Sequence, residues 1–155
     1  MMLPLVPPLR AQASAAPLPS QIFTAKKVFI SNAGGELSDY VWNGGPDRPY
    51  NELYAAIKSW GRYEFVAAPG DADIVLEISF SYILGGPNPH DAPETIPQLK
   101  LVLLDAKTRI ALWTISETVK PFSRHKTGDR NFEDAIDKLV SDLKALTAQP
   151  AAAAK

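Results

Sequence analysis

The sequence contains no cysteine among its 155 residues. This absence excludes disulfide bonds, thiolate nucleophiles, cysteine-ligated metals and lipid attachment at a cysteine within the sequence. Histidine is almost as scarce, because His90 and His125 are the only two, and neither has a second histidine at metal-ligand spacing. Sequences of the G-x-S-x-G, H-E-x-x-H and phosphate-loop types are also missing, so we predict no catalytic, cofactor or metal site.

An excess of charge of either sign is missing too. Sixteen basic and seventeen acidic residues give a net charge of -1 and a pI of about 6.1. Such a balance creates no field that attracts nucleic acid or anionic lipid, so we predict no nucleic-acid partner. Binding of nucleic acid through Lys26, Lys27 and the basic stretch 120–130 stays open as a weaker alternative. No apolar run approaches the ~20 residues of a transmembrane helix, and we expect a soluble mature protein.

The amino-terminal residues resemble an export signal. Residues 1–13 are mostly apolar and end in Ala11-Gln12-Ala13, the small-x-small pattern after which signal peptidase cleaves. The stretch lacks a basic start and is interrupted by prolines, which a signal peptide truncated at its start would explain. We therefore predict a signal peptide over 1–13, a flexible lead-in over 14–23 and a periplasmic or secreted protein. A disordered Ala/Pro-rich leader is the alternative.

A first strand and a first helix follow the lead-in. The β-branched and aromatic run 26–31 predicts a strand that is buried on both faces and ends at a glycine turn. From Pro49 onward, apolar residues recur three and four positions apart until Gly61, which predicts an amphipathic helix with a glycine stop. Asp47 is expected to accept hydrogen bonds from the free amides of its first turn.

Further strands and a second helix follow from the same kinds of pattern. The predicted segments are a strand at 63–68, a strand at 74–80, an irregular loop at 85–97, a hairpin at 98–119 that turns at 105–108, and a last helix that Asn131 caps. The predicted order is β-α-β-β-β-β-α, over a single α+β domain at 24–147, with a disordered tail at 148–155. Because two amphipathic helices must cover a sheet of about five strands, we expect a two-layer sandwich with a mixed sheet and both helices on one face.

Acidic residues surround the strand at 74–80. Asp71 and Asp73 lie two residues apart, and carboxylates at this spacing bind hard cations when further oxygen ligands are present. The remaining ligands of a calcium loop are missing from the sequence, and aspartates in turns commonly accept hydrogen bonds from backbone amides. We therefore predict structural roles for both aspartates, and we expect Glu77 to point away from the core.

The loops 36–50 and 84–97 are the predicted partner-binding face, because long loops with glycine and proline on a rigid sheet often carry recognition. The candidate residues are Tyr40, Trp42, Asn43, Arg48 and His90. Trp42 has a second interpretation, as a lid that folds over the core. Trp60 and Trp113 are predicted to be packing residues, because both lie in periodic elements.

Two short motifs resemble those of a known group of proteins. The segment 72–80 has an "ADxxL" pattern, and 105–113 has the pattern of a "DxxTxxxLW" hairpin. The matching residues are Ala72, Asp73, Leu76, Asp105, Thr108, Leu112 and Trp113. These segments resemble small bacterial envelope proteins of unknown function related to the amino-terminal domain of TolB and, more distantly, to LpoB and CsgG. The resemblance implies a non-enzymatic envelope module and supplies no catalytic residues, although this sequence lacks the cysteine that the lipoprotein members acylate.

The sequence thus favours an exported, non-enzymatic binding or assembly-accessory module with a protein partner in the cell envelope. The alternative is a small hydrolase or metal-dependent enzyme that uses Asp71, Asp73 and either His90 or His125. Such an enzyme requires these groups to converge in one pocket.

Overall fold

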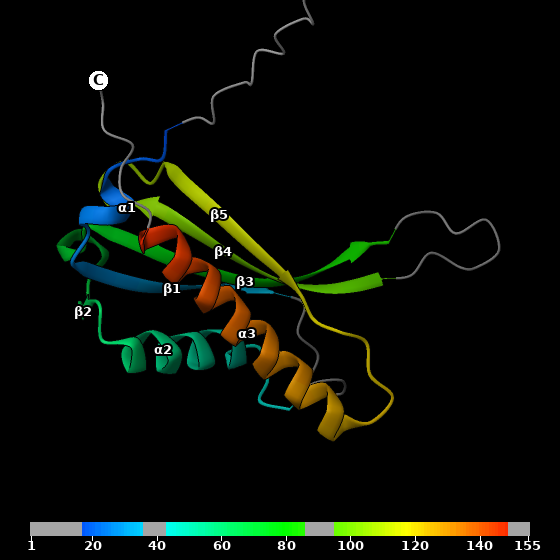
Figure 1. Ribbon diagram of the computed structural model, residues 1–155. Coiled ribbons are helices and arrows are strands. Elements are labelled where there is room, and N and C mark those ends of the chain that lie inside the picture. Colours follow the sequence, from blue (N-terminus) through cyan, green and yellow to red (C-terminus); the bar gives the residue numbers. More distant parts are fainter. Residues whose placement is uncertain (1–16, 36–42, 86–94, 149–155) are drawn as a thin grey trace, which may run out of the picture.

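The computed structural model describes residues 17–35, 43–85 and 95–148, which form one α+β unit (Figure 1). In chain order its elements are α1 (Gln21–Thr24), β1 (Lys27–Gly35), α2 (Arg48–Trp60), β2 (Glu64–Phe65), the 3-10 turn η1 (Pro69–Asp71), β3 (Ile74–Leu84), β4 (Thr95–Asp105), β5 (Ala111–Thr118) and α3 (His125–Ala148). The predicted order of strands and main helices is confirmed, and the short α1 precedes it.

The five strands form one mixed sheet in the order β2-β1-β3-β4-β5. β1 is parallel to both β2 and β3, whereas β3, β4 and β5 are successively antiparallel. α2 makes the crossover between the parallel strands β1 and β2, and a short turn joins the antiparallel strands β4 and β5. The mixed sheet predicted from the sequence is therefore confirmed.

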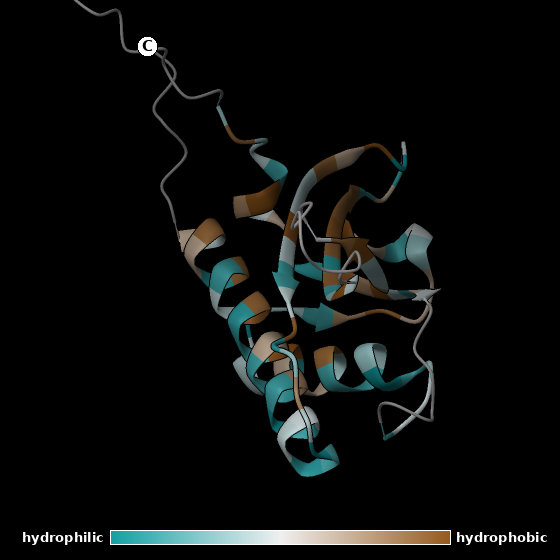
Figure 2. Ribbon diagram, turned by 90° about the vertical axis from the view of Figure 1, so that its right-hand side faces the viewer, coloured by the Kyte–Doolittle hydropathy of each residue, from teal (hydrophilic) through white to brown (hydrophobic). Residues whose placement is uncertain are grey.

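One face of the sheet packs against α2 and α3 and forms the core (Figure 1). The central strands contribute alternate residues to it, such as Leu76 and Ile78 from β3 and Leu101 from β4, all fully buried. α3 meets them with Phe132 and Leu139, which are also fully buried. Figure 2 shows apolar and polar residues alternating along α3, as its amphipathic sequence requires.

The opposite face of the sheet is more polar, and Glu77 lies on it as predicted. Its carboxylate is 3.8 Å from the Arg109 guanidinium, and both side chains are partly exposed. Two apolar residues on this face are nevertheless buried, Val75 and its neighbour on β4, Leu104. β1 was predicted to be buried on both faces and is not, because only alternate residues such as Val28 are buried while Phe29 is half-buried.

Two predicted helix caps are wrong. Asp47 precedes α2, but its side chain accepts no hydrogen bond from the first turn and instead accepts one from Asn32 Nδ2 at 2.9 Å. α3 begins at His125, six residues before Asn131. Asn131 lies inside the helix and donates hydrogen bonds from its side chain to the carbonyls of Lys120 and Pro121, which ties the incoming chain to the helix.

The packed part of the chain begins earlier than residue 24. α1 places Ile22 in the core, where its side chain is fully buried. Gln21 also donates a hydrogen bond to the Asp105 carboxylate at 2.5 Å. The sequence underestimated this segment because a four-residue helix is too short to show a periodic pattern. The predicted stop of α2 is confirmed, since Gly61 adopts a left-handed conformation with φ of 71°.

Candidate functional site

The aspartate between η1 and β3 has a structural role. Asp73 Oδ2 accepts hydrogen bonds from the backbone N–H groups of Lys26 and Lys27, both at 2.8 Å. Both bonds lower the pKa of Asp73, and the bond from the Lys27 N–H has the largest effect. The carboxylate therefore fixes the start of β1 beside the start of β3, which is the backbone role predicted for it.

A second aspartate organises the turn between β4 and β5. Asp105 Oδ1 accepts hydrogen bonds from the Thr108 N–H at 2.6 Å, the Lys107 N–H at 2.9 Å and the Thr108 hydroxyl at 2.9 Å. Gln21 donates to its other oxygen. Led by the bond from the Thr108 N–H, these contacts lower the pKa of Asp105 to about 2. The hydrogen bonds of this carboxylate therefore hold the turn together and tie it to α1.

The Asp105 turn should make stability depend on acidity. Because its pKa is lowered in the folded state, Asp105 stabilises the fold above its ordinary pKa of 3.8, and this contribution is lost as the pH falls toward about 2. We expect Asp105→Asn to unfold at lower urea concentration than the parent at pH 7, with the difference shrinking at pH 2.5. The control Asp71→Asn should leave the pH 7 midpoint unchanged, because Asp71 is exposed and the described residues offer its carboxylate no hydrogen bond like those of Asp105. An equal difference at both pH values would contradict the role of the ionised carboxylate.

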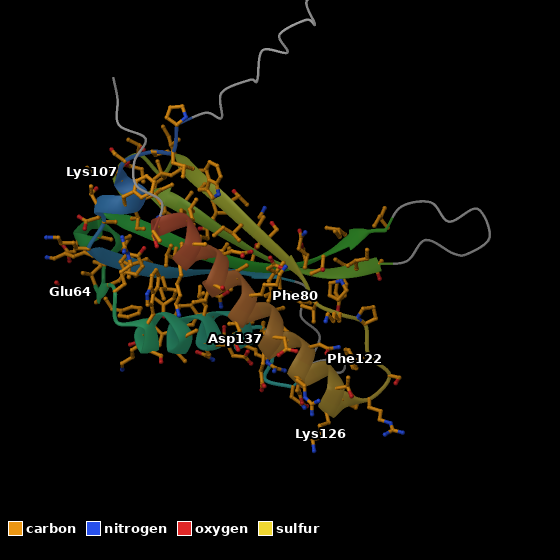
Figure 3. All side chains as sticks on the ribbon, viewed as in Figure 1. Glu64, Phe80, Lys107, Phe122, Lys126 and Asp137 are labelled. Atoms are coloured by element: carbon orange, nitrogen blue, oxygen red, sulfur yellow. The ribbon has the colours of Figure 1, made fainter. Side chains whose placement is uncertain are left out.

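The structure does not bring the carboxylates and His125 of the alternative enzyme together. Asp73 and Lys107 line one shallow groove, whereas His125 begins α3 next to Lys126. Figure 3 shows Lys107 and Lys126 at opposite ends of the molecule. Among residues 17–35, 43–85 and 95–148, no group of three histidine, aspartate or glutamate side chains is placed to hold a metal ion. His90 lies outside these residues.

The basic positions of the nucleic-acid alternative are separated in the same way. Lys27 pairs in register with Glu64 at one end of the sheet, and Lys126 lies at the other end (Figure 3). Lys26 and Lys27 and the stretch 120–130 therefore form no continuous basic surface.

The best-connected polar cluster joins the start of α2 to the start of α3. Arg48, only 8% exposed, donates from Nε to Glu52 at 2.5 Å and from Nη1 to Asp129 at 2.6 Å. It also donates to the Asn43 carbonyl at 3.0 Å, and Asn43 in turn donates to Asp129 at 2.8 Å. The guanidinium lies 4.4 Å from the centre of the Phe132 ring, a cation–π contact. We call Asn43, Arg48, Glu52, Asp129 and Phe132 the Arg48 junction.

One cation serves two carboxylates in the Arg48 junction. Burial opposes the charge on Arg48, but its bonds to Glu52 and Asp129 outweigh this cost and raise its pKa. The bond from Arg48 lowers the pKa of Asp129. Burial raises the pKa of Glu52, against the effect of Arg48 and with that of the nearby Glu133 carboxylate. The junction fastens two helices and, with Gly44, lines a surface hollow.

Only some of the predicted partner-binding residues lie in the described part of the chain. Asn43 is exposed, whereas Arg48 is buried and held by both helices. Tyr40, Trp42 and His90 lie outside the described residues. Trp60 packs against the core as predicted, but Trp113 is 40% exposed because β5 is an edge strand that the helices cover incompletely.

Sequence reasoning missed an aromatic groove beside the outer edge of β1. Tyr50 and Tyr54 of α2 stack with ring centres 6.5 Å apart, and Tyr54 meets Phe65 of β2 at 4.8 Å. Phe29 and Ile30 of β1 complete the groove. The spacing of the two tyrosines indicated an apolar helix face, but it could not indicate that β2 would be too short to cover that face.

Comparison with known proteins identifies the fold. No protein-family model and no curated protein matches the sequence. A DUF4136 family protein from Bacteroides thetaiotaomicron has a similar structure, with 12% identity, 88% of this chain and 94% of that chain covered, and a TM-score of 0.56. A homologue of a neuraminyllactose-binding hemagglutinin from Helicobacter pylori is also similar, with 11% identity, 90% of this chain and 92% of that chain covered, and a TM-score of 0.52. A third similar structure is a PelC variant dodecamer from Paraburkholderia phytofirmans, with 16% identity, 84% of this chain and 94% of that chain covered, and a TM-score of 0.51.

At these identities the likeness concerns the fold alone. It agrees with the predicted α+β class, while the resemblance to the TolB amino-terminal domain stays a prediction. Among the described residues, no helix combines the length and apolar character that a membrane span requires.

Proposed function

We propose that this chain is an exported, non-enzymatic binding or assembly module of the bacterial cell envelope. The main support is that its most strongly hydrogen-bonded polar side chains hold the fold together. Asp73, Asp105 and Arg48 have the most hydrogen bonds and shifted pKa values, and each is committed to backbone amides or to a neighbouring element. Asp73 and Arg48 do line surface hollows, but their hydrogen bonds go to partners within the chain, whereas the groups of an active site keep theirs for a substrate.

Two proteins of similar structure also support a role in binding or assembly. PelC is a dodecamer, and the Helicobacter pylori protein is a homologue of a binding protein. Residues 1–13 provide the export signal in this proposal. Tyr40, Trp42, Asn43 and His90 provide the partner surface, whereas Arg48 is left out of it because it is buried.

Expression of the full sequence in a Gram-negative host tests the compartment. We expect to find the protein in the periplasmic fraction, with the mass of a chain that begins at Ser14. Ala13→Arg should block cleavage and retain the uncleaved chain, because signal peptidase requires a small residue there. An uncleaved parent protein in the cytoplasmic fraction would refute export.

A photo-cross-linking amino acid at position 43 tests the partner surface in the same cells. We expect a cross-linked envelope protein from position 43 and none from position 59, an exposed site on α2. Equal labelling from both positions would contradict a localised partner surface.

A further inference from the structure

The two edges of the sheet differ in their capacity to pair with another strand. β2 forms one edge and contains only two residues, one of them the exposed Glu64. β5 forms the other edge and extends over eight residues. Short and charged edge strands prevent pairing between molecules, whereas long uncovered ones permit it. On the β2 side the edge is stepped, because β2 covers only the start of β1, and β1 beyond it has an irregular register between Asn32 and Gly35. The β5 edge is therefore the better suited to extend the sheet.

Within residues 17–35, 43–85 and 95–148, the outer side of β5 presents backbone groups without partners. Just beyond the strand, the Val119 N–H donates to the Pro97 carbonyl of β4. Because backbone groups alternate between the two sides of a strand, those of Thr114, Ser116 and Thr118 point away from β4. Within the described residues, none of these outward groups has a hydrogen-bond partner.

The side chains of β5 offer little protection against pairing. Residues 111–118 include no lysine, arginine or proline. Their one charge, Glu117, points toward α3, where it is 2.5 Å from the Lys138 ammonium and only 10% exposed. Trp113 on the same strand is 40% exposed, although it pairs in register with the fully buried Leu103. A strand that pairs with β5 would cover part of this ring.

We propose that β5 pairs antiparallel with β5 of a second copy, about a two-fold axis at Ile115. This register pairs all of 112–118 and brings together the outward backbone groups of Thr114 and of Ser116 of the second copy. Their hydroxyl side chains then meet on the polar face, a favourable cross-strand pair. Glu117 faces Trp113 of the second copy, so the two glutamates stay apart.

A second copy fits this edge better than a head-to-tail chain of copies does. Head-to-tail pairing would join β5 to a stepped edge, where β2 offers only two residues in a ladder and β1 lies one strand further in. Pairing of like edges closes at two copies and leaves exposed only the stepped edge that β2 and the end of β1 form. The result is one continuous sheet with the helices of both copies on the same face. This inference goes beyond the proposed function and does not depend on it.

The mass of the protein in solution tests the pairing. We expect twice the 16.8 kDa chain mass, less any cleaved signal, in light scattering after gel filtration. Ser116→Pro removes an outward N–H that β4 does not use, and symmetry doubles the loss to two hydrogen bonds. We expect it to raise the dissociation constant about 30-fold. Ser116→Ala keeps the N–H and should leave the dimer intact, and circular dichroism should show both variants folded.

The absence of cysteine makes the register directly testable. Thr114→Cys and Ser116→Cys should form a disulfide when the two variants are mixed, because hydrogen-bonded antiparallel residues have Cα atoms about 5.5 Å apart. Neither variant alone should cross-link efficiently, since identical residues then lie on a diagonal of roughly 7–8 Å.

Three results would overturn the pairing. They are a monomer at about 100 μM, a dimer that Ser116→Pro leaves unchanged, and an assembly larger than two copies. None of them bears on export or on cross-linking at position 43, so failure of this inference is distinguishable from failure of the proposed function.

Discussion

Replacement of Gly35 by alanine is expected to lower the free energy of unfolding by about 3 kcal/mol. Gly35 is the last residue of β1 and pairs with Phe80 of β3, directly after an irregularity in the register. Its φ of 150° lies in a region that side chains rarely adopt. A Cβ atom at this position would lie 2.1 Å from the Phe80 carbonyl oxygen. Since that oxygen belongs to the central strand, relief of the clash requires β1 to separate from β3.

Gly34→Ala is the matched control for this prediction. Gly34 also has a positive φ, 74°, but a Cβ atom there would meet no atom within 4 Å. Its substitution should cost only the strain of the left-handed backbone, about 1 kcal/mol. Urea denaturation of both variants at pH 7 measures the difference. If Gly35→Ala costs no more than Gly34→Ala, the close approach of β1 to β3 at Phe80 is wrong.

The same glycine shows where sequence reasoning stopped short. The sequence predicted a turn after residue 31, because two glycines follow. In the structure the strand continues to Gly35 through a bulge-like irregularity in its pairing with β3. The requirement for glycine comes from Phe80, far along the chain, and no local pattern carries that information. A glycine pair is equally consistent with a turn and with a close approach between strands.

Local signals were sufficient where the structure depends on neighbouring residues. α2 ends at Gly61 and the hairpin turns at Asp105, both as predicted, because a left-handed stop and an aspartate turn are determined by a few adjacent positions. The alternation along β3 also held, with the exception of Val75. Burial of Val75 beside Leu104 depends on pairing between strands and was not visible in the order of residues.

The Arg48 junction depends on contacts between distant segments. Arg48 and Glu52 lie four residues apart on α2, a spacing that the sequence displays and that predicts an ion pair. Asp129 is 81 residues from Arg48 along the chain, and its turn of helix was assigned to a loop before Asn131. With the start of α3 misplaced, the sequence could assign Arg48 only to a recognition loop.

Arg48→Ala is expected to destabilise the fold by about 3 kcal/mol. The substitution removes hydrogen bonds to Glu52, Asp129 and the Asn43 carbonyl, and it uncovers one face of Phe132. The two carboxylates are left close to each other without their shared cation. Arg48→Lys should recover less than half of the loss, because one ammonium cannot reproduce the divergent bonds of a guanidinium. Thermal and urea unfolding at pH 7 would measure both variants.

Arg109→Ala provides a control that removes the same side chain from an exposed ion pair. Arg109 is 49% exposed and lies 3.8 Å from Glu77, a separation at which the pair contributes little. We expect its loss to change the free energy of unfolding by less than about 0.5 kcal/mol. Equal effects of the two alanine substitutions would mean that Arg48 does not join α2 to α3. A large loss at Arg48 alone, with 1 M salt weakening it only slightly, would indicate that the junction is shielded from solvent.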